Sequence, residues 1–423
     1  MRVQKDTLKN GIRLLTVPMP HLGSAAVMIG IGAGSRYEQK EVVGIAHFTE
    51  HMLFKGTKRR PSSLAISSEL ESLGAQFNAF TTDEATAYYV KAAAKNLPKV
   101  LEILTDLVFS SKFDPKDISK EREVILEELK MYRDEPRSWV AHIYQKLMFG
   151  DHPLGRDPLG TPETLEAINR KDFLDYIGRW YRAKNIVVAV AGKIEGEQAL
   201  GKTREVLGGL DGRDVGEPEV FKERQQEPAI LIEERGTDQT HLILSARAYP
   251  RNHPKREALQ ILNAILGGGM SSRLFEEVRT KQGLAYYVTS TWDAYSDTGS
   301  LAIQAGVNNS RASGAIEVVL GELGKLKDKA VPKEELRKAK EVLRGSLLLG
   351  IESTNGACSY FLTQEVLDRK IETPQQKLKK IDAVTASDVQ EVAKDIFVTR
   401  GLNLALIGPF SEPERFRKLL NIP

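Results

Sequence analysis

Ile186-Val-Val-Ala-Val-Ala-Gly192 and Leu402-Asn-Leu-Ala-Leu-Ile-Gly408 share one pattern, an aliphatic run that ends in glycine, and these two glycines lie 216 residues apart. A second pair of segments, Asp114-Pro-Lys-Asp-Ile and Val331-Pro-Lys-Glu-Glu, carries prolines that lie 217 residues apart. Helix starts and strand ends of this kind occur in any protein with helices and strands. The two nearly equal offsets, close to half the chain, and the repeated order of elements nevertheless favour an internal duplication.

A polar segment separates the two copies. Residues 212–228 contain two prolines and many charged side chains, a composition typical of a linker. We therefore expect an N-terminal domain at residues 1–212, a linker at 213–228 and a C-terminal domain at 229–423. Within each copy, strands come in pairs and are followed by helical periods. This pattern predicts an α+β fold, in which a mostly antiparallel or mixed sheet has helices packed on one face.

The composition is that of a globular protein. Of the 423 residues, 41% are hydrophobic and 28% are charged. Lys and Arg number 60 against 57 Asp and Glu, a balance that disfavours nucleic acid or an acidic membrane as partner. The single cysteine, Cys358, excludes an intrachain disulfide and a multi-cysteine metal site. The chain shows no apolar signal core and no run near the roughly 20 residues of a membrane span. We expect a soluble, cytoplasmic protein.

His47-Phe48-Thr49-Glu50-His51 lies in a segment with helical periodicity. On a helix, His47 and His51 leave the same face and can share one metal ion, while Glu50 lies close enough to contact a water on that metal. The order is the inverse of the usual zinc-protease helix motif. A solvated helix face is the alternative, but the apolar neighbours predict burial, and buried polar groups need partners. Zinc fits this ligand set best.

A catalytic zinc site needs a third protein ligand, and the helical segment 116–133 offers several glutamates. Helical phase places Glu121 and Glu128 beside its apolar face, while Glu123 and Glu127 fall on the opposite side. We assign Glu128 as the third ligand and Glu121 as a catalytic carboxylate that orients a ligand or the metal's water. The alternative is that both glutamates pair with arginines at the boundary of the core.

A family resemblance rests on these residues. His47-Phe-Thr-Glu-His-Met-Leu-Phe-Lys-Gly-Thr57 and Glu121-Arg-Glu-Val-Ile-Leu-Glu-Glu128 resemble the pitrilysin-type (inverzincin) metallopeptidases, most closely the short chains similar to mitochondrial processing peptidase. Residues 73–81 and 152–155 extend the resemblance, which covers essentially the whole chain. It implies two similar α+β domains per chain and a chamber enclosed by four such domains. Because one chain supplies two, the resemblance implies a dimer, and we expect a homodimer.

The resemblance also suggests residues that bind substrate. Arg279 and Tyr286 match the family's Arg and Tyr, at the same seven-residue spacing, and the family analogy places them at the partner chain's metal. A surface arginine and a sheet-packing tyrosine are the alternative, and Tyr287 is expected on the opposite face of the same strand. Asn78 and Ala79 resemble the edge strand that pairs with the substrate backbone, although a turn or capping asparagine explains Asn78 equally well.

The second copy lacks the histidine motif, and Gly345 stands where the repeat offset places the counterpart of Glu128. We therefore expect one Zn²⁺ per chain. The predicted function is a zinc endopeptidase that hydrolyses peptides or unfolded polypeptide segments, with Glu50 taking a proton from water and passing it to the leaving amine. The main alternative is a non-catalytic structural or accessory subunit of the same family, of the respiratory-complex core type or an inactive heterodimer partner.

Overall fold

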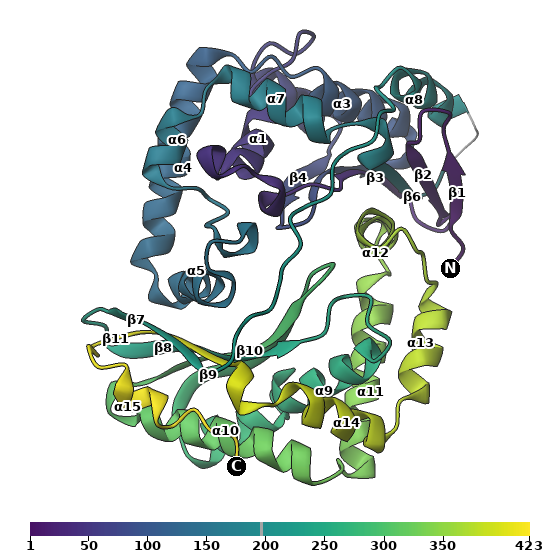
Figure 1. Cartoon of the computed structure of the whole chain (residues 1–423). Coiled ribbons are helices and arrows are strands. Elements are labelled where there is room, and N and C mark those ends of the chain that lie inside the picture. The colour runs from purple at the N-terminus through teal and green to yellow at the C-terminus, as the bar shows by residue number, and fades with distance from the viewer. Residues whose placement is uncertain (195–197) are drawn as a thin grey trace. The chain divides into compact units, whose positions relative to one another are not determined.

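The computed structural model describes residues 1–194 and 198–423 and divides into two compact units (Figure 1). Each unit is assembled from three separate stretches of chain. Unit 1 comprises Met1–Leu129, Arg156–Glu219 and Leu348–Pro374, and unit 2 comprises Lys130–Gly155, Val220–Leu347 and Gln375–Pro423. These units differ from the two contiguous domains, 1–212 and 229–423, that the sequence suggests, because the chain passes between them five times.

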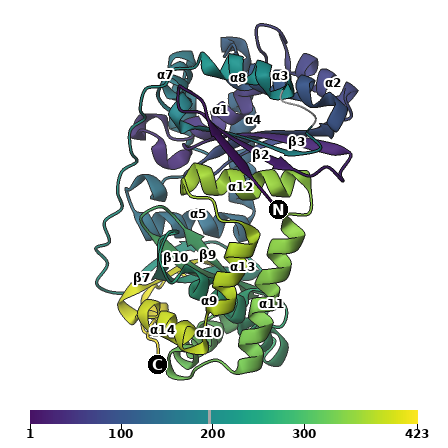
Figure 2. The ribbon, with the colours of Figure 1, turned by 90° about the vertical axis from the view of Figure 1, so that its right-hand side faces the viewer.

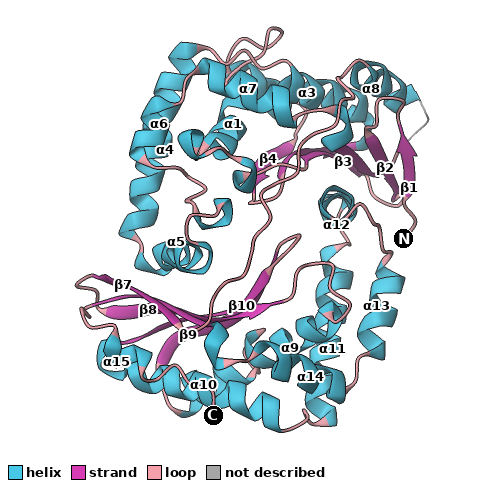
Figure 3. Ribbon diagram, viewed as in Figure 1, coloured by secondary structure: helices cyan, strands magenta, loops and turns pink. Residues whose placement is uncertain are grey.

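Unit 1 is built on a mixed sheet with the strand order β1-β2-β6-β3-β5-β4 (Figure 3). Its pairs are antiparallel except for β2 and β6, which run parallel. The strands are β1 (Gln4–Thr7), β2 (Arg13–Pro18), β3 (Ser24–Ile31), β4 (Gln76–Thr81), β5 (Thr86–Ala93) and β6 (Ile186–Gly192). Because β4 is the last strand in this order, one of its backbone edges has no neighbouring strand within the sheet.

Unit 2 repeats this topology. Its sheet has the order β7-β11-β8-β10-β9, again with one parallel pair, β7 and β11. The strands are β7 (Ala229–Glu234), β8 (Gln239–Ala248), β9 (Ala285–Ala294), β10 (Gly299–Asn308) and β11 (Leu402–Gly408). This order matches β2-β6-β3-β5-β4 position by position, and the repeated segments β6 and β11 take equivalent places. The predicted duplication and the α+β class are confirmed.

The helices of each copy cover one face of its own sheet. In unit 1 these are α1 (Ile45–Leu53), α2 (Ser63–Ser72), α3 (Leu97–Phe109), α4 (Pro115–Asp134, whose last turns belong to unit 2), α6 (Pro162–Ala167), α7 (Arg170–Trp180) and α8 (Gln198–Gly208). Buried side chains of α1, α3 and α7 join Val27, Ile29 and Val188 of the sheet in one core. No helix in the described residues is long and apolar enough to cross a membrane.

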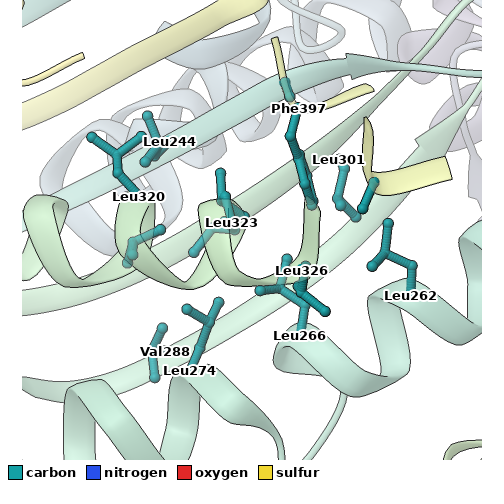
Figure 4. Packing of buried hydrophobic residues seen from close by; sticks show 14 of the residues in the cluster. Leu244, Leu262, Leu266, Leu274, Val288, Leu301, Leu320, Leu323, Leu326 and Phe397 are labelled. Atoms are coloured by element: carbon teal, nitrogen blue, oxygen red, sulfur yellow. The ribbon is translucent and has the colours of Figure 1, made fainter. Parts of the chain in front are cut away.

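Unit 2 has its own core on the corresponding face. Leu320, Leu323 and Leu326 pack with Leu262 and Leu266 (Figure 4). The helices are α9 (Arg256–Gly267), α10 (Ala312–Asp328), α11 (Lys333–Gly350, whose last turn belongs to unit 1), α13 (Pro374–Ala383), α14 (Ala386–Ile396) and α15 (Glu414–Arg417). Burying apolar surface at about 25 cal/mol per Å² makes such cores the main favourable contribution to folding.

The opposite face of each sheet is covered by a helix from the other half of the sequence. In unit 1, α12 (Thr354–Leu367) lies along β3 and β6 (Figure 2), and its Phe361 and Leu362 pack with Met28 and Val187. In unit 2, α5 (Pro136–Phe149) packs on β7, β8 and β11. The sequence analysis expected helices on one face only. Both faces are buried because the chain exchanges α5 and α12 between the two units.

Candidate metal centre

Helix α1, which carries the histidine motif, begins at a buried carboxylate. Glu38 Oε2 and Oε1 accept hydrogen bonds from the backbone N–H groups of Gly44 and Ala46, each at 2.8 Å. The first N–H groups of a helix have no partner within the helix, and these bonds to Glu38 satisfy two N–H groups at the start of α1. Gly44 has φ of +95°, and a Cβ there would approach the carbonyl oxygen of Leu159 to 2.8 Å. These contacts fix where α1 starts.

His47, His51 and Glu128 converge at one point. Their candidate ligand atoms all lie within 4.8 Å of one another. Oε2 of Glu128 is 3.8 Å from Nε2 of His47 and 3.8 Å from Nε2 of His51, and the two imidazole rings have centroids 4.6 Å apart. The histidines come from α1 and the glutamate from α4. The structure thus brings together the three residues that the sequence assigns as metal ligands.

The donor set fits a zinc ion. Two ligands at about 2.1 Å from a tetrahedral zinc lie about 3.4 Å apart. The two 3.8 Å separations between Glu128 and the histidines are close to this value, and all three ligand atoms lie within 4.8 Å of one another. Burial and the neighbouring His51 lower the pKa of His47 to about 4, which leaves the imidazole neutral near pH 7, the form that binds metal. Three protein ligands leave one zinc position for water, the arrangement of catalytic rather than structural sites.

Glu121 orients one of the ligands. Its Oε1 lies 2.8 Å from Nδ1 of His51, and its Oε2 lies 2.5 Å from Nζ of Lys55. Burial alone would raise the pKa of Glu121, but the hydrogen bonds to His51 and Lys55 outweigh it and lower the pKa overall. An ionised Glu121 accepts the Nδ1 proton of His51, which leaves Nε2 unprotonated and facing the metal position. These partners are a histidine and a lysine rather than the arginines of the alternative interpretation.

Glu50 is held by the edge strand of the sheet. Thr81, at the end of β4, donates its hydroxyl hydrogen to Oε2 of Glu50 at 2.5 Å. Burial raises the pKa of the Glu50 carboxyl, and a raised pKa makes a carboxylate a stronger proton acceptor near neutral pH. Thr81 and Lys55 were not assigned a role from the sequence. No local pattern points to Thr81, because its partner lies 31 residues away in the chain.

Asn78 and Ala79 lie on β4 itself, at the edge of the sheet in unit 1. The side chain of Asn78 is exposed, and its Oδ1 accepts a hydrogen bond from the Ala79 N–H at 2.9 Å. Ala79 packs against the core of unit 1. Because the same short strand ends in Thr81, one strand carries both an open backbone edge and the contact to Glu50.

Arg279 and Tyr286 belong to unit 2, whereas the candidate metal ligands belong to unit 1. Arg279 lies in the π-helical segment Phe275–Lys281 and places its guanidinium 4.7 Å from the ring centroid of Phe275. Tyr286 on β9 is 62% exposed. The strand alternation that predicts Tyr287 on the face opposite Tyr286 is interrupted here, because the pairing of β9 with β10 shifts between Gly306 and Val307.

The sequence matches known proteins over nearly its whole length. Residues 14–162 match the family described as "Insulinase (Peptidase family M16)", and residues 167–343 match the "Peptidase M16 inactive domain". An uncharacterized zinc protease of Bacillus subtilis is 36% identical, with 96% of this chain and 98% of that protein covered. The chain belongs to the M16 peptidase family. An uncharacterized zinc protease of Mycobacterium leprae, another relative, is 34% identical over 99% of this chain and 95% of its own.

Solved structures share the fold of this chain. A protease from Helicobacter pylori superposes with a TM-score of 0.90 at 25% identity and covers 96% of this chain and 99% of its own. A Pseudomonas fluorescens structure described as a peptidase M16 inactive domain shares the fold, with a TM-score of 0.89 at 20% identity. It covers 97% of this chain and 98% of its own. Within this M16 chain, the candidate metal ligands all lie in the region that matches the peptidase rather than the inactive domain.

Proposed function

We propose that this protein is a zinc-dependent endopeptidase that hydrolyses peptides or unfolded polypeptide segments. The observation that carries the proposal is the convergence of His47, His51 and Glu128 within 4.8 Å, with Glu50 one residue before the second histidine. Relatives that cover nearly the whole chain are named zinc proteases, which supports the choice of metal.

In this mechanism the chain's own residues bind and orient the metal and transfer the proton. His47, His51 and Glu128 hold the ion, and Glu121 sets the ring orientation of His51. When bound, zinc supplies Lewis acidity that polarises the scissile carbonyl and acidifies water. Glu50, with its raised pKa, takes the proton of the attacking water and delivers it to the leaving amine.

Substrate binding is proposed at two elements. An extended peptide adds to the free edge of β4 beside Asn78 and Ala79, since an exposed strand edge offers unpaired backbone groups. Arg279 and Tyr286 of the partner subunit in a homodimer bind substrate carbonyls and the developing oxyanion. The dimer encloses a chamber that favours short or unfolded substrates.

We also propose a cytoplasmic location. The single cysteine, Cys358, is buried, which accords with a reducing compartment.

The alternative is a structural or accessory subunit without activity of its own. Such a subunit has no need of a complete catalytic set. This chain retains both histidines, Glu128 and Glu50, and positions Glu121 and Thr81 against them. The retained set therefore favours the enzyme.

The experiment that tests the proposal is Glu50→Gln in the zinc-loaded protein. We expect the variant to bind zinc like the parent, because Glu50 is not a ligand, and to lose cleavage of an unstructured peptide mixture analysed by mass spectrometry. Glu123→Gln, on an exposed position of α4, is the matched control and should cleave normally. Full activity of Glu50→Gln would exclude Glu50 as the base, and an inactive, zinc-loaded parent would favour the accessory subunit.

A further inference from the structure

Tyr286 is the extra residue of a β-bulge. Along the pairing of β10 with β9, Gly306 lies opposite Tyr287, and the next residue, Val307, lies opposite Ala285. Tyr286 is therefore skipped and has no partner across the strand pair. The burial confirms the interruption, since Ala285 and Val288, three residues apart, both enter the core of unit 2. A bulge of this kind re-aims a side chain and is often found beside functional sites.

Tyr287 anchors the bulge by crossing the neighbouring strand at Gly306, which has no side chain. Gly306 pairs with Tyr287 on one side and with His241 of β8 on the other. Because Gly306 has no side chain, the Tyr287 ring reaches across it, and Oη lies 2.9 Å from Nδ1 of His241. A Cβ at position 306 would lie 2.3 Å from the ring atom Cε1 of Tyr287. Only glycine leaves room for the ring in this position.

The same ring is covered by the exchanged helix α5. The guanidinium of Arg137 lies 4.3 Å from the ring centroid of Tyr287, a cation–π distance. Gln304 of β10 donates its Nε2 hydrogen to the backbone carbonyl of Arg137 at 2.7 Å, which ties the start of α5 to the sheet. The Tyr287 ring thus contacts Arg137 and Gly306, and its hydroxyl is hydrogen-bonded to His241.

The hydrogen bond between Tyr287 and His241 joins two neutral groups. Burial raises the pKa of Tyr287 to about 12, and burial lowers the pKa of His241. Near pH 7 the phenol therefore keeps its proton, and the unprotonated Nδ1 of His241 can accept it. We call Arg137, His241, Tyr287 and Gly306 the bulge lock.

We propose that the bulge lock holds Tyr286 in its outward orientation, which makes Tyr287 and His241 positioning residues for the substrate backbone that Tyr286 binds. The lock itself is independent of any reaction, but its role in substrate binding rests on the proposed peptidase function. Tyr286 is 62% exposed, and a phenol on such a surface keeps one direction only if its backbone is held.

The kinetic experiment is a double-mutant cycle on a peptide substrate with the zinc-loaded enzyme. Tyr287→Phe removes the hydroxyl that binds His241 and should lower kcat/KM by about 10- to 100-fold, the effect of misplacing a substrate-binding group. In Tyr286→Phe, the same change at Tyr287 should have no further effect, because the group being positioned is already gone. Additive effects, or full activity of Tyr287→Phe, would overturn the positioning role.

His241 provides a test by conservative replacement. His241→Ala removes the acceptor for the Tyr287 hydroxyl and should reproduce the loss seen in Tyr287→Phe. His241→Asn keeps a polar side-chain atom near the position of Nδ1 and should restore most of the activity. Equal activity of the two His241 variants would overturn the assignment of His241. Tyr144→Phe is the matched control, because it removes a buried hydroxyl bond to Ser300 in the same unit, and it should leave kcat/KM unchanged.

A structural measurement separates this inference from the proposed function. Hydrogen exchange at the amides of residues 285–288 should accelerate in Tyr287→Phe and in His241→Ala but not in Tyr144→Phe. Unchanged exchange would overturn the lock itself, whatever the kinetics show. If exchange accelerates while the zinc-loaded parent cleaves no peptide, the lock stands, and both the peptidase function and the role of the lock in substrate binding are overturned.

Discussion

At the candidate centre, single hydrogen bonds orient a metal ligand and the proposed catalytic base. Glu121 is not one of the three converging candidate ligands, yet its contact with Nδ1 of His51 favours the tautomer whose Nε2 is free for the metal. Thr81 likewise bonds to Glu50 rather than to the metal position. Each side chain acts through a neighbouring residue. We therefore expect replacement of Glu121 to weaken zinc binding and replacement of Thr81 to lower turnover.

Glu121→Gln should weaken zinc binding. The amide cannot stabilise the Nδ1 proton of His51 as a carboxylate does, and it loses the ion pair with Lys55. Changes to groups that orient a metal ligand typically cost about 10- to 100-fold in affinity. Competition with a chromophoric chelator would measure the loss, and Glu123→Gln should bind zinc like the parent. Unchanged affinity of Glu121→Gln would show that His51 is oriented without this contact.

Thr81→Val should lower turnover and leave zinc content unchanged. The valine has nearly the shape of threonine but cannot donate to Glu50, so the carboxylate loses the bond that holds it in place, and a misplaced catalytic group can cost up to about 100-fold in rate. We therefore expect kcat to fall by about tenfold or more. Thr81→Ser keeps the hydroxyl and should retain most of the rate. Equal rates for the valine and serine variants would contradict a role for this bond.

At the scale of elements, a charged cluster joins the segment after α1 to two helices. Arg60 bonds to Asp106 at 2.6 Å and to Glu102 at 2.9 Å, both on α3, and also to Glu69 on α2. The Arg60 side chain is only 6% exposed, so these carboxylates compensate its buried charge. The cluster ties α2 and α3 to the chain that leaves the histidine helix.

This cluster predicts acid sensitivity. The hydrogen bond to Arg60 lowers the pKa of Glu69 from 4.5 to about 2. A depressed folded-state pKa contributes stability above pH 4.5, and that contribution is lost as the pH falls from 4.5 toward 2. Glu69→Gln should therefore make the unfolding free energy less dependent on pH in this range. Urea unfolding of the zinc-free proteins at several pH values would measure it, and parallel curves for parent and variant would contradict the prediction.

At the scale of the whole molecule, each unit needs both halves of the sequence. Phe361 is fully buried in the cluster that covers the face of the unit 1 sheet opposite its main core, although it lies in the second half of the chain. A truncation at residue 228 would remove α12 and leave that face open. The two copies are therefore not independent folding units, despite the repeated strand order.

Phe361→Ala should destabilise unit 1 rather than the unit that holds most of the second half. A buried Phe→Ala change typically costs about 3–5 kcal/mol. Hydrogen exchange should accelerate in β3 and β6, against which α12 packs, and much less in β8 and β10. Leu349→Ala, at a 69% exposed position, is the control and should change neither. Faster hydrogen exchange confined to unit 2 would contradict the assignment of α12 to unit 1.

The sequence by itself determined the features that follow from regular spacing of residues along a helix or from repetition along the chain. The four-residue separation of His47 and His51 places both rings on one face of a helix, and helical phase singled out Glu121 and Glu128 on α4. The offset between β6 and β11 revealed the duplication. Only the tertiary structure decided the bond from Thr81 to Glu50, the bulge at Tyr286 and the exchange of α5 and α12. These features join residues far apart in the chain through side-chain packing and strand register, and local periodicity carries no information about which distant surfaces meet.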